Sequence, residues 1–174
     1  SAKAKHPYVI VEEYVEGLDY RLLVINGKMV AAARREPAHV IGDGISSIGT
    51  LIQKINSDPR RGFGHEKVLT FIEVDSMTER LLSLRGLSIN SCLGEEEKIY
   101  LKTTANLSQG GTATDVTDEV HPDIRLMAER AARIIGMDCM GVDALATDVS
   151  LPPDQSNIKV IEVNAAPGFR MHLE

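Results

Sequence analysis

The 174-residue sequence has only two cysteines, no tryptophan and no long apolar run. Cys92 and Cys139 do not have the spacing of paired metal ligands, so the pattern indicates neither a cysteine metal site nor a disulfide framework, and a reducing cytoplasm is the expected compartment. No stretch approaches the roughly 18 apolar residues of a membrane-spanning helix. Basic residues form only short pairs and the net charge is −6. We therefore expect neither a membrane nor a nucleic acid as a partner.

The composition is that of a soluble globular domain. Hydrophobic residues make up 43% and charged residues 25%, which allows a substantial core. The length suits one domain, or one domain with a small subdomain. The sequence starts Ser-Ala-Lys-Ala-Lys without an apolar signal region, and we expect it to be a piece of a longer chain.

The clearest local signal is Asn26-Gly27 between two apolar runs, which predicts a two-residue β-hairpin because both turn residues need positive φ. A symmetric register then places Asp19 opposite Arg34. The period of two in a strand puts Arg21 on the same face as these two residues.

Other segments carry weaker helix and strand signals. The predicted helices follow an apolar stripe at residues 48–55, a capping box of Ser76 and Glu79, and Pro122, with Gly136 ending the last one. The predicted strands are residues 8–15, 98–103, 140–146 and 157–164. This mixture predicts an α+β fold with hairpins rather than a regular βαβ alternation.

The last predicted hairpin carries the candidate chemistry. Alternation places Ile158, Val160, Glu162 and Asn164 on one strand face, and a symmetric connection places Asp143 opposite Glu162. Two carboxylates so close repel each other unless a positive charge lies between them. With the amide oxygen they form an oxygen cluster of the kind that Mg²⁺ prefers. The same side chains are equally consistent with ordinary exposed strand residues and a turn-forming asparagine.

Residues 161–168, Ile-Glu-Val-Asn-Ala-Ala-Pro-Gly, resemble the Glu-x-Asn-x-x-Pro-Gly signature that closes the ATP-grasp fold. In that family the Glu bridges two Mg²⁺ ions, the Asn binds one of them, and an Asp comes from the preceding strand. The resemblance therefore implies Asp143, Glu162 and Asn164 as metal ligands. Longer stretches are similar to the cyanophycin synthetases within this superfamily, namely residues 37–44, 58–62, 105–122 and 167–173.

The resemblance implies the C-terminal lobe of an ATP-grasp domain, an antiparallel sheet with flanking helices and an inserted α/β segment, without the first ATP-grasp lobe. The implied division of this partial domain over residues 1–174 is a hinge strand and hairpin (1–36), an insertion (37–100) and a metal-binding portion (101–174).

The resemblance also assigns the nucleotide site. The hinge would hold adenine and the ribose would bind to Asp19; the hinge residues are Glu12, Glu13, Tyr14 and Val15. Asn106 with Gly110 and Gly111 resembles the loop that closes on the phosphates, since glycine permits close backbone approach. Taken alone, the hinge glutamates also fit a solvated strand edge, and the glycine pair fits a simple turn.

A departure from the family concerns charge at the reacting phosphoryl group. Many ATP-grasp ligases carry an Arg two residues before the metal-binding Asp, where this sequence has Gly141. We therefore assign that charge to Arg21 or Arg34 as catalytic residues, with Asn106 beside them. Arg21 is also a candidate cross-strand partner for Asp19.

The activity that the resemblance implies is ATP-dependent ligation of a carboxylate to an amine through an acyl phosphate, with ATP and two Mg²⁺ ions as cofactors. The family adds L-aspartate to a poly-aspartate backbone, so an acidic peptide primer, L-aspartate, the first lobe and a Mur-ligase-like domain of the same polypeptide are the expected partners. The fragment alone is expected to be inactive, and an oligomer is left open. The alternatives are the ATP-grasp half of a bifunctional glutathione-synthesis enzyme, acting on glycine and γ-glutamylcysteine, or a non-catalytic nucleotide- or metal-binding module. Arg60, Arg61 and His65 are candidates for binding the acidic polymer or the incoming carboxylate, or else belong to a solvated turn.

Overall fold

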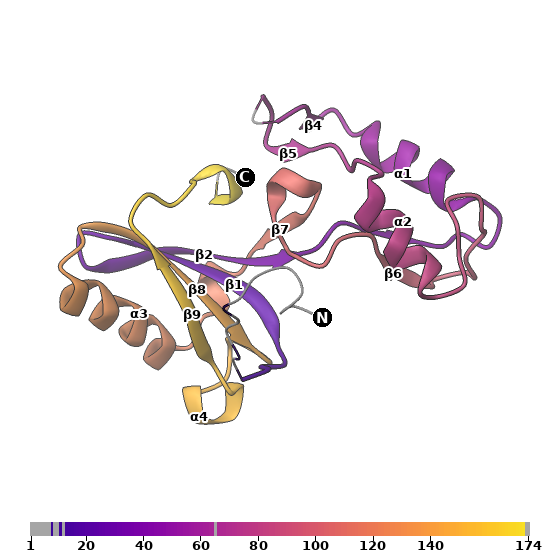
Figure 1. Cartoon of the computed structure of the whole chain (residues 1–174). Coiled ribbons are helices and arrows are strands. Elements are labelled where there is room, and N and C mark those ends of the chain that lie inside the picture. Colours follow the sequence, from indigo (N-terminus) through magenta and orange to yellow (C-terminus); the bar gives the residue numbers. More distant parts are fainter. Residues whose placement is uncertain (1–7, 9–10, 12, 65, 173–174) are drawn as a thin grey trace.

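The computed structural model describes residues 8, 11, 13–64 and 66–172. A five-stranded antiparallel sheet forms one lobe, and a smaller lobe of short helices and strands extends from one end of it (Figure 1). The sheet order is β7-β2-β1-β8-β9. The strands are β1 (Leu18–Ile25), β2 (Lys28–Glu36), β7 (Thr112–Asp115), β8 (Cys139–Ala146) and β9 (Lys159–Asn164).

One face of the sheet is covered by α3 (Pro122–Ile135), which supplies the first hydrophobic core (Figure 1). The helix has Pro122 in its first turn and ends at Gly136 with φ of 77°, as the sequence predicts. The core packs alternate residues of the strands against the helix; its fully buried members include Leu22, Val24, Ile124, Met140 and Val142. The opposite face of the sheet is therefore left for polar chemistry.

A second core lies in the smaller lobe, and its buried residues come from positions 38 to 101. It is built by β3 (His39–Ile41) paired with β6 (Lys98–Tyr100), and by α1 (Ile48–Asn56) and α2 (Ser76–Ser83). A short parallel pair, β4 (Arg61–Gly62) and β5 (Leu69–Thr70), lies at its edge. The remaining elements are α4 (Pro153–Ser156) and the 3₁₀ turns η2 (Leu107–Gln109), η3 (Thr117–Glu119) and η4 (Arg170–His172). The division of the chain at residues 36 and 100 stays a prediction.

The β1–β2 hairpin is confirmed, but its predicted register is wrong. Asn26 and Gly27 have φ of 50° and 71°, as the turn requires. Leu23 pairs with Ala31 and Val24 with Met29, so Val30 is an extra residue on β2, and this bulge shifts the pairing so that Asp19 lies opposite Arg35 rather than Arg34. A one-residue shift moves a side chain to the other face of the sheet.

A second bulge lies between β8 and β9. Asp143 pairs with Glu162, as predicted, but Ala144 pairs with Val160, so Ile161 is the extra residue. The prediction that Val160 shares a face with Glu162 is therefore wrong. The bulge turns the end of β9 so that the Glu162 side chain lies on the same face of the sheet as that of Asp143.

Other element boundaries also differ from the predictions. The N-cap of α2 is Asp75, whose side chain accepts from the Thr78 N–H, rather than Ser76. Aspartate caps a helix as well as serine does, so the helix can begin one residue earlier, with Asp75 as its N-cap. Of residues 8–15, the described positions 8, 11 and 13–15 form no strand, because β-propensity does not supply the neighbouring strand that a ladder needs. The predicted strand 98–103 stops at Tyr100.

Within the described part of the chain, none of the helices has the length and apolar character needed to cross a membrane.

Candidate functional site

The sheet face opposite α3 carries the candidate site. A cleft of about 580 Å³ opens on this face, where it is lined by Asp19, Arg21, Arg35, Asp143 and Glu162. Tyr100 and residues 103–106, which follow β6, contribute further lining residues. The cleft therefore lies where the large sheet meets the connection to the smaller lobe (Figure 1).

Asp143 is at the centre of the charged side chains. Its Oδ1 accepts from Arg21 Nε, and its Oδ2 accepts from Arg21 Nη2 at 2.7 Å. Arg35 Nη2 lies 3.2 Å from the same Oδ2, and the side chain of Asp143 is only 9% exposed. The register of β1 and β8, which pairs Arg21 with Asp143, imposes this contact. A two-pronged guanidinium–carboxylate contact is a strong and directional interaction.

Asp19 belongs to the same network. Its Oδ1 accepts from Arg35 Nε at 2.7 Å and lies 2.6 Å from Arg35 Nη2. Burial raises the pKa of Asp19 above its ordinary value, while the charge and hydrogen bond of Arg35 oppose this rise. Arg35 therefore links Asp19 to Asp143 across β1.

Glu162 and Asn164 complete the oxygen cluster. Asn164 Nδ2 donates to Glu162 Oε1 at 3.0 Å and reaches Asp143 Oδ2 at 3.4 Å. Among the described residues Glu162 makes no ion pair, and it is exposed on the cleft side of β9. The predicted convergence of Asp143, Glu162 and Asn164 is therefore present in the structure.

The donor set fits a hard divalent cation. The side chains supply two carboxylates and one amide, and rotation of the Asn164 side chain about its last torsion would turn the amide oxygen toward the carboxylates. The described residues contain no cluster of three or more His, Cys, Asp or Glu side chains able to hold a metal. The local charge is nevertheless acidic, because three carboxylates (Asp19, Asp143, Glu162) face two guanidiniums. Magnesium, which keeps several water and phosphate ligands, suits so small a protein contribution.

Arg34, the alternative cationic residue, does not reach this cluster. It pairs with Tyr20 on the helix side of the sheet and is exposed. Arg35 occupies the position that the predicted register gave to Arg34. The Ala-Ala-Ala run before these arginines offers no alternation from which the bulge could have been read.

Gly141 makes room for the site. A Cβ atom at this position would lie 2.9 Å from Arg21 Cδ and 2.9 Å from Pro167 Cβ. The place where many ATP-grasp ligases carry an arginine is therefore filled here by the Arg21 stem and by the segment that follows Asn164. Arg21 can therefore occupy its observed position only because residue 141 has no side chain.

Residues 106–111, which we name the glycine loop, reach the cleft only at Asn106. Gly110 and Gly111 are buried, and their N–H groups donate to the carbonyls of Leu107 and Asn106 at 3.1 and 3.2 Å. In this structure these amides are occupied within the loop. The phosphate-binding role assigned to the glycines stays a prediction.

The predicted adenine-binding hinge lies at the edge of the site. Glu13 and Tyr14 are exposed, Val15 is half-buried, and none of the three lines the cleft, whose lining begins at Gly17. Glu12 lies outside the described residues. The structure therefore brings together Asp19, Arg21, Asn106, Asp143 and Glu162, with Asn164 alongside, but not the hinge.

Several cleft residues were missed in the sequence. Besides Arg35, they are Leu18, Glu36, Tyr100, Thr103, Thr104, Leu145 and Ile161. Ile161 is half-exposed because the bulge lifts it out of the alternation. His172 carries no functional signal in the sequence, yet it is half-buried and the charge of Arg21 acts on it. Burial lowers the pKa of His172, the charge of Arg21 lowers it further, and Asp115 opposes both.

Comparison with known proteins gives this geometry a context. No protein-family model matches the sequence. A cyanophycin synthetase from Crocosphaera subtropica is 52% identical over 173 residues, which are 99% of this chain and 20% of that protein. One from Synechocystis is 48% identical over 171 residues, 98% of this chain and 20% of that protein. The chain is homologous to a segment of the cyanophycin synthetases.

Relatives outside the cyanophycin synthetases are more distant. The glutathione biosynthesis bifunctional protein of Clostridium perfringens is 36% identical over 164 residues, 94% of this chain and 21% of its own. The crystal structure of a bifunctional glutathione synthetase from Pasteurella multocida superposes with a TM-score of 0.79 at 31% identity, covering 93% of this chain and 22% of that one. The chain thus spans about a fifth of the length of these proteins. The predicted fold class, an α+β portion of an ATP-grasp domain, is confirmed.

Proposed function

We propose that this chain is the metal-binding part of an ATP-dependent carboxylate–amine ligase that adds L-aspartate to a poly-aspartate backbone. The observation that carries the proposal is the convergence of Asp143, Glu162 and Asn164 beside Arg21 at the cleft. The homology to cyanophycin synthetases supports the choice of substrate, and the names of the other relatives support ligase chemistry.

Asp143, Glu162 and Asn164 are the residues that would hold Mg²⁺. When bound, the ions would neutralise phosphate charge during phosphoryl transfer. The side chains of Asp143 and Glu162 face each other across β8 and β9 and so fix the place of that charge. Two ions are proposed on the family resemblance.

Arg21 and Arg35 are the cationic side chains in the cleft. Asp143 holds the Arg21 guanidinium in one orientation, and Asp19 does the same for Arg35. A fixed guanidinium in a partly buried cleft stabilises an anionic phosphoryl or acyl-phosphate group without reorganisation. We assign Arg21 to that group and Asn106 to the opposite wall, and we assign Arg35 in place of Arg34.

The reaction proceeds in two displacements. A carboxylate oxygen of the peptide primer attacks the γ-phosphorus of ATP, the bond from that phosphorus to the β,γ-bridging oxygen breaks, and ADP leaves. The amine nitrogen of aspartate then attacks the acyl carbon, and phosphate departs with the electrons of the carbon–oxygen bond while the nitrogen loses a proton. The chain's contribution is positioning and electrostatic stabilisation.

The nucleotide would lie along the cleft. Asp19 would accept from the ribose hydroxyls, residues 12–15 would hold adenine through backbone groups, and Gly110 and Gly111 would approach the phosphates. The last of these needs the glycine loop to release the two N–H bonds described above. The remaining partners are the rest of the polypeptide, including a first ATP-grasp lobe and a Mur-ligase-like domain.

The test is ADP release by the full-length ligase under two substrate pairs. L-Aspartate with a poly-aspartate primer should support turnover, whereas glycine with γ-glutamylcysteine should not. Turnover with the second pair alone would favour the glutathione-type reaction, for which the 0.79 TM-score is the supporting observation. No turnover with either pair, together with calorimetric binding of MgATP, would leave a non-catalytic nucleotide-binding module.

A further inference from the structure

A small part of the smaller lobe contacts both the glycine loop and η4, the turn that follows β9. The β4–β5 unit, defined as residues 61–64 and 66–72, lies next to η4 and the glycine loop (Figure 1). The sequence suggested that arginines here bind an acidic polymer. The structure gives Arg61 a different environment, since it is only 4% exposed.

Arg61 is bonded to the glycine loop. Its Nη1 donates to the carbonyl of Thr70 at 2.6 Å and to the carbonyl of Gly110 at 3.1 Å. A buried guanidinium that lost these acceptors would be left with unsatisfied donors, which makes the contact costly to break. Arg61 is therefore committed to holding the loop and is not presented to solvent.

The same loop rests on Ile72. Gly110 has φ of +86°, and a Cβ there would lie 2.7 Å from Ile72 Cγ1 and 2.9 Å from Ile72 Cα. Ile72 is itself fixed to α1, because its N–H donates to Asn56 Oδ1 at 2.8 Å and its carbonyl accepts from Asn56 Nδ2 at 3.0 Å. The seat of the glycine loop thus extends into the core of the smaller lobe.

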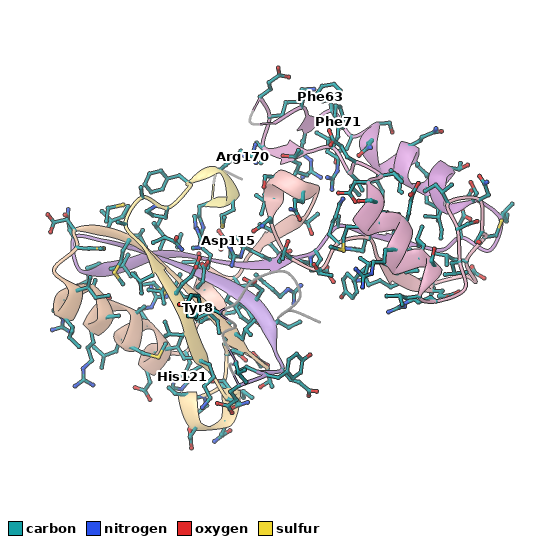
Figure 2. The ribbon with its side chains drawn as sticks, in the orientation of Figure 1. Tyr8, Phe63, Phe71, Asp115, His121 and Arg170 are labelled. Carbon is teal, nitrogen blue, oxygen red and sulfur yellow. The ribbon has the colours of Figure 1, made fainter. Side chains whose placement is uncertain are left out.

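The other side of the β4–β5 unit is bonded to the chain that follows the metal-binding strand. Arg170, six residues after Asn164, donates through Nη1 to the carbonyls of Gly64 and Lys67, both at 3.0 Å. Its Nη2 donates to Thr70 Oγ1 at 3.3 Å. Figure 2 labels Arg170, the first residue of η4, near the unit that carries Phe63 and Phe71.

We propose that the β4–β5 unit sets the spacing between the glycine loop and the metal-binding end of β9, with Arg61 and Arg170 as positioning residues. The inference rests on the proposed function for the identity of the substrates. Thr70 joins the two contacts, since its carbonyl accepts from Arg61 and its hydroxyl from Arg170. Any displacement of the smaller lobe would then change the distance between Asn106 and Glu162, and so the position of a ligand held between them.

The test uses hydrogen exchange in the full-length ligase, which requires no turnover. Arg61→Met should speed exchange of residues 104–112 about tenfold, the expected loss for one charge-assisted hydrogen bond, and leave residues 18–25 unchanged. Arg60→Met is the matched control, because this adjacent arginine is exposed and pairs with Asp58, and it should change neither segment. The proposal would be overturned if residues 104–112 of Arg61→Met exchanged at the wild-type rate, or if exchange of residues 18–25 increased by the same factor.

Two further variants keep the test decisive. If Arg61→Met does not fold, Ile72→Val removes the Cδ1 methyl attached to the Cγ1 atom that faces Gly110, and it should loosen residues 104–112 selectively by about threefold. Uniform or absent loosening would count against the idea. Arg170→Met should loosen residues 161–168 in the same selective way. In the ligation assay Arg61→Met should lower kcat about tenfold while the KM for ATP changes less, because misplaced groups lose transition-state alignment. If exchange of residues 104–112 speeds up selectively but the wild-type enzyme ligates neither substrate pair, the proposed function is rejected and the positioning role of Arg61 is still supported.

Discussion

Asp143 and Glu162 face each other as proposed metal ligands, yet their surroundings predict opposite effects on stability. The Asp143 side chain is 9% exposed and is bonded to two arginines, whereas Glu162 is exposed and bonded only to Asn164 among the described residues. Asp143→Ala should therefore destabilise the fold as well as abolish ATP turnover. Glu162→Ala should abolish turnover and leave the fold intact.

The expected size of the difference follows from the ion pairs. Removing one partner of a buried pair costs about 3–5 kcal/mol, because the remaining charge stays buried without compensation. For a domain of this length each kcal/mol lowers Tm by roughly 2–4 °C, so Asp143→Ala should unfold roughly 6–20 °C below the wild type. Glu162→Ala should stay within about 0.5 kcal/mol of it, as exposed substitutions do.

Thermal and urea unfolding of the 174-residue chain measure this directly, with ADP release by the full-length ligase as the activity readout. In the double variant Arg21→Ala/Asp143→Ala the loss should be smaller than the sum of the single losses, since each single change leaves its partner unpaired. Equal stability of Asp143→Ala and Glu162→Ala would refute the description of Asp143 as the buried centre of the network. Near-normal ADP release by either variant would reject the metal assignment.

Three further predictions concern glycines and an ion pair. Gly141→Ala should lower stability by about 1–3 kcal/mol in urea unfolding, because its Cβ would overlap Arg21 and Pro167; a neutral result would contradict the close packing. In Gly27→Ala the new Cβ would have no atom within 4 Å, so the variant should lose only about 1 kcal/mol of stability, from the φ of +71°. A loss of stability as large as that of Gly141→Ala would show that backbone strain dominates both. The hydrogen bond from Lys102, and after it the Thr78 N–H, holds the pKa of Asp75 below its ordinary value of 3.8. The ionised Asp75 therefore stabilises the folded state above pH 3.8, and this contribution is lost as the pH falls through the lower pKa of the folded state. Asp75→Asn should therefore be less stable at neutral pH, and the gap should close on acidification; a gap independent of pH would exclude the Lys102 pair as its source.

Local signals predicted the parts of the fold that depend on local chemistry. Asn26-Gly27 needed positive φ at two successive positions, which few other pairs tolerate, and the turn formed there. Pro122 and Gly136 likewise bound a helix by their own backbone preferences. Asp143 opposite Glu162 was also correct, although a bulge begins at the next residue.

Bulges account for what could not be predicted. Val30 and Ile161 each occupy an extra position in one strand, and neither has a glycine or proline within two residues that would indicate a bulge. The bulge at Val30 placed Arg35 rather than Arg34 at the site, and the bulge at Ile161 brought that residue into the cleft lining. The cleft also depends on residues 100–106 meeting the sheet, a contact between distant segments that no local pattern encodes.

The two bulges act on the same cluster from opposite sides. The first carries Arg35 to the face of Asp19 and Asp143, and the second carries Glu162 to the face of Asp143 although Val160 remains on the helix side. Without the first bulge Arg34 rather than Arg35 would lie on this face, and without the second Glu162 would share the helix-side face of Val160. The cluster of three carboxylates and two guanidiniums is thus assembled by departures from regular pairing. Bulges of this kind re-aim side chains next to active sites. Here the first brings the Arg35 guanidinium to 3.2 Å from Asp143, while Glu162 stays open to the cleft. Arg21 can therefore hold Asp143 before a substrate enters and offer its remaining donors to an anionic group afterwards, because a guanidinium has five N–H groups and Asp143 takes two of them.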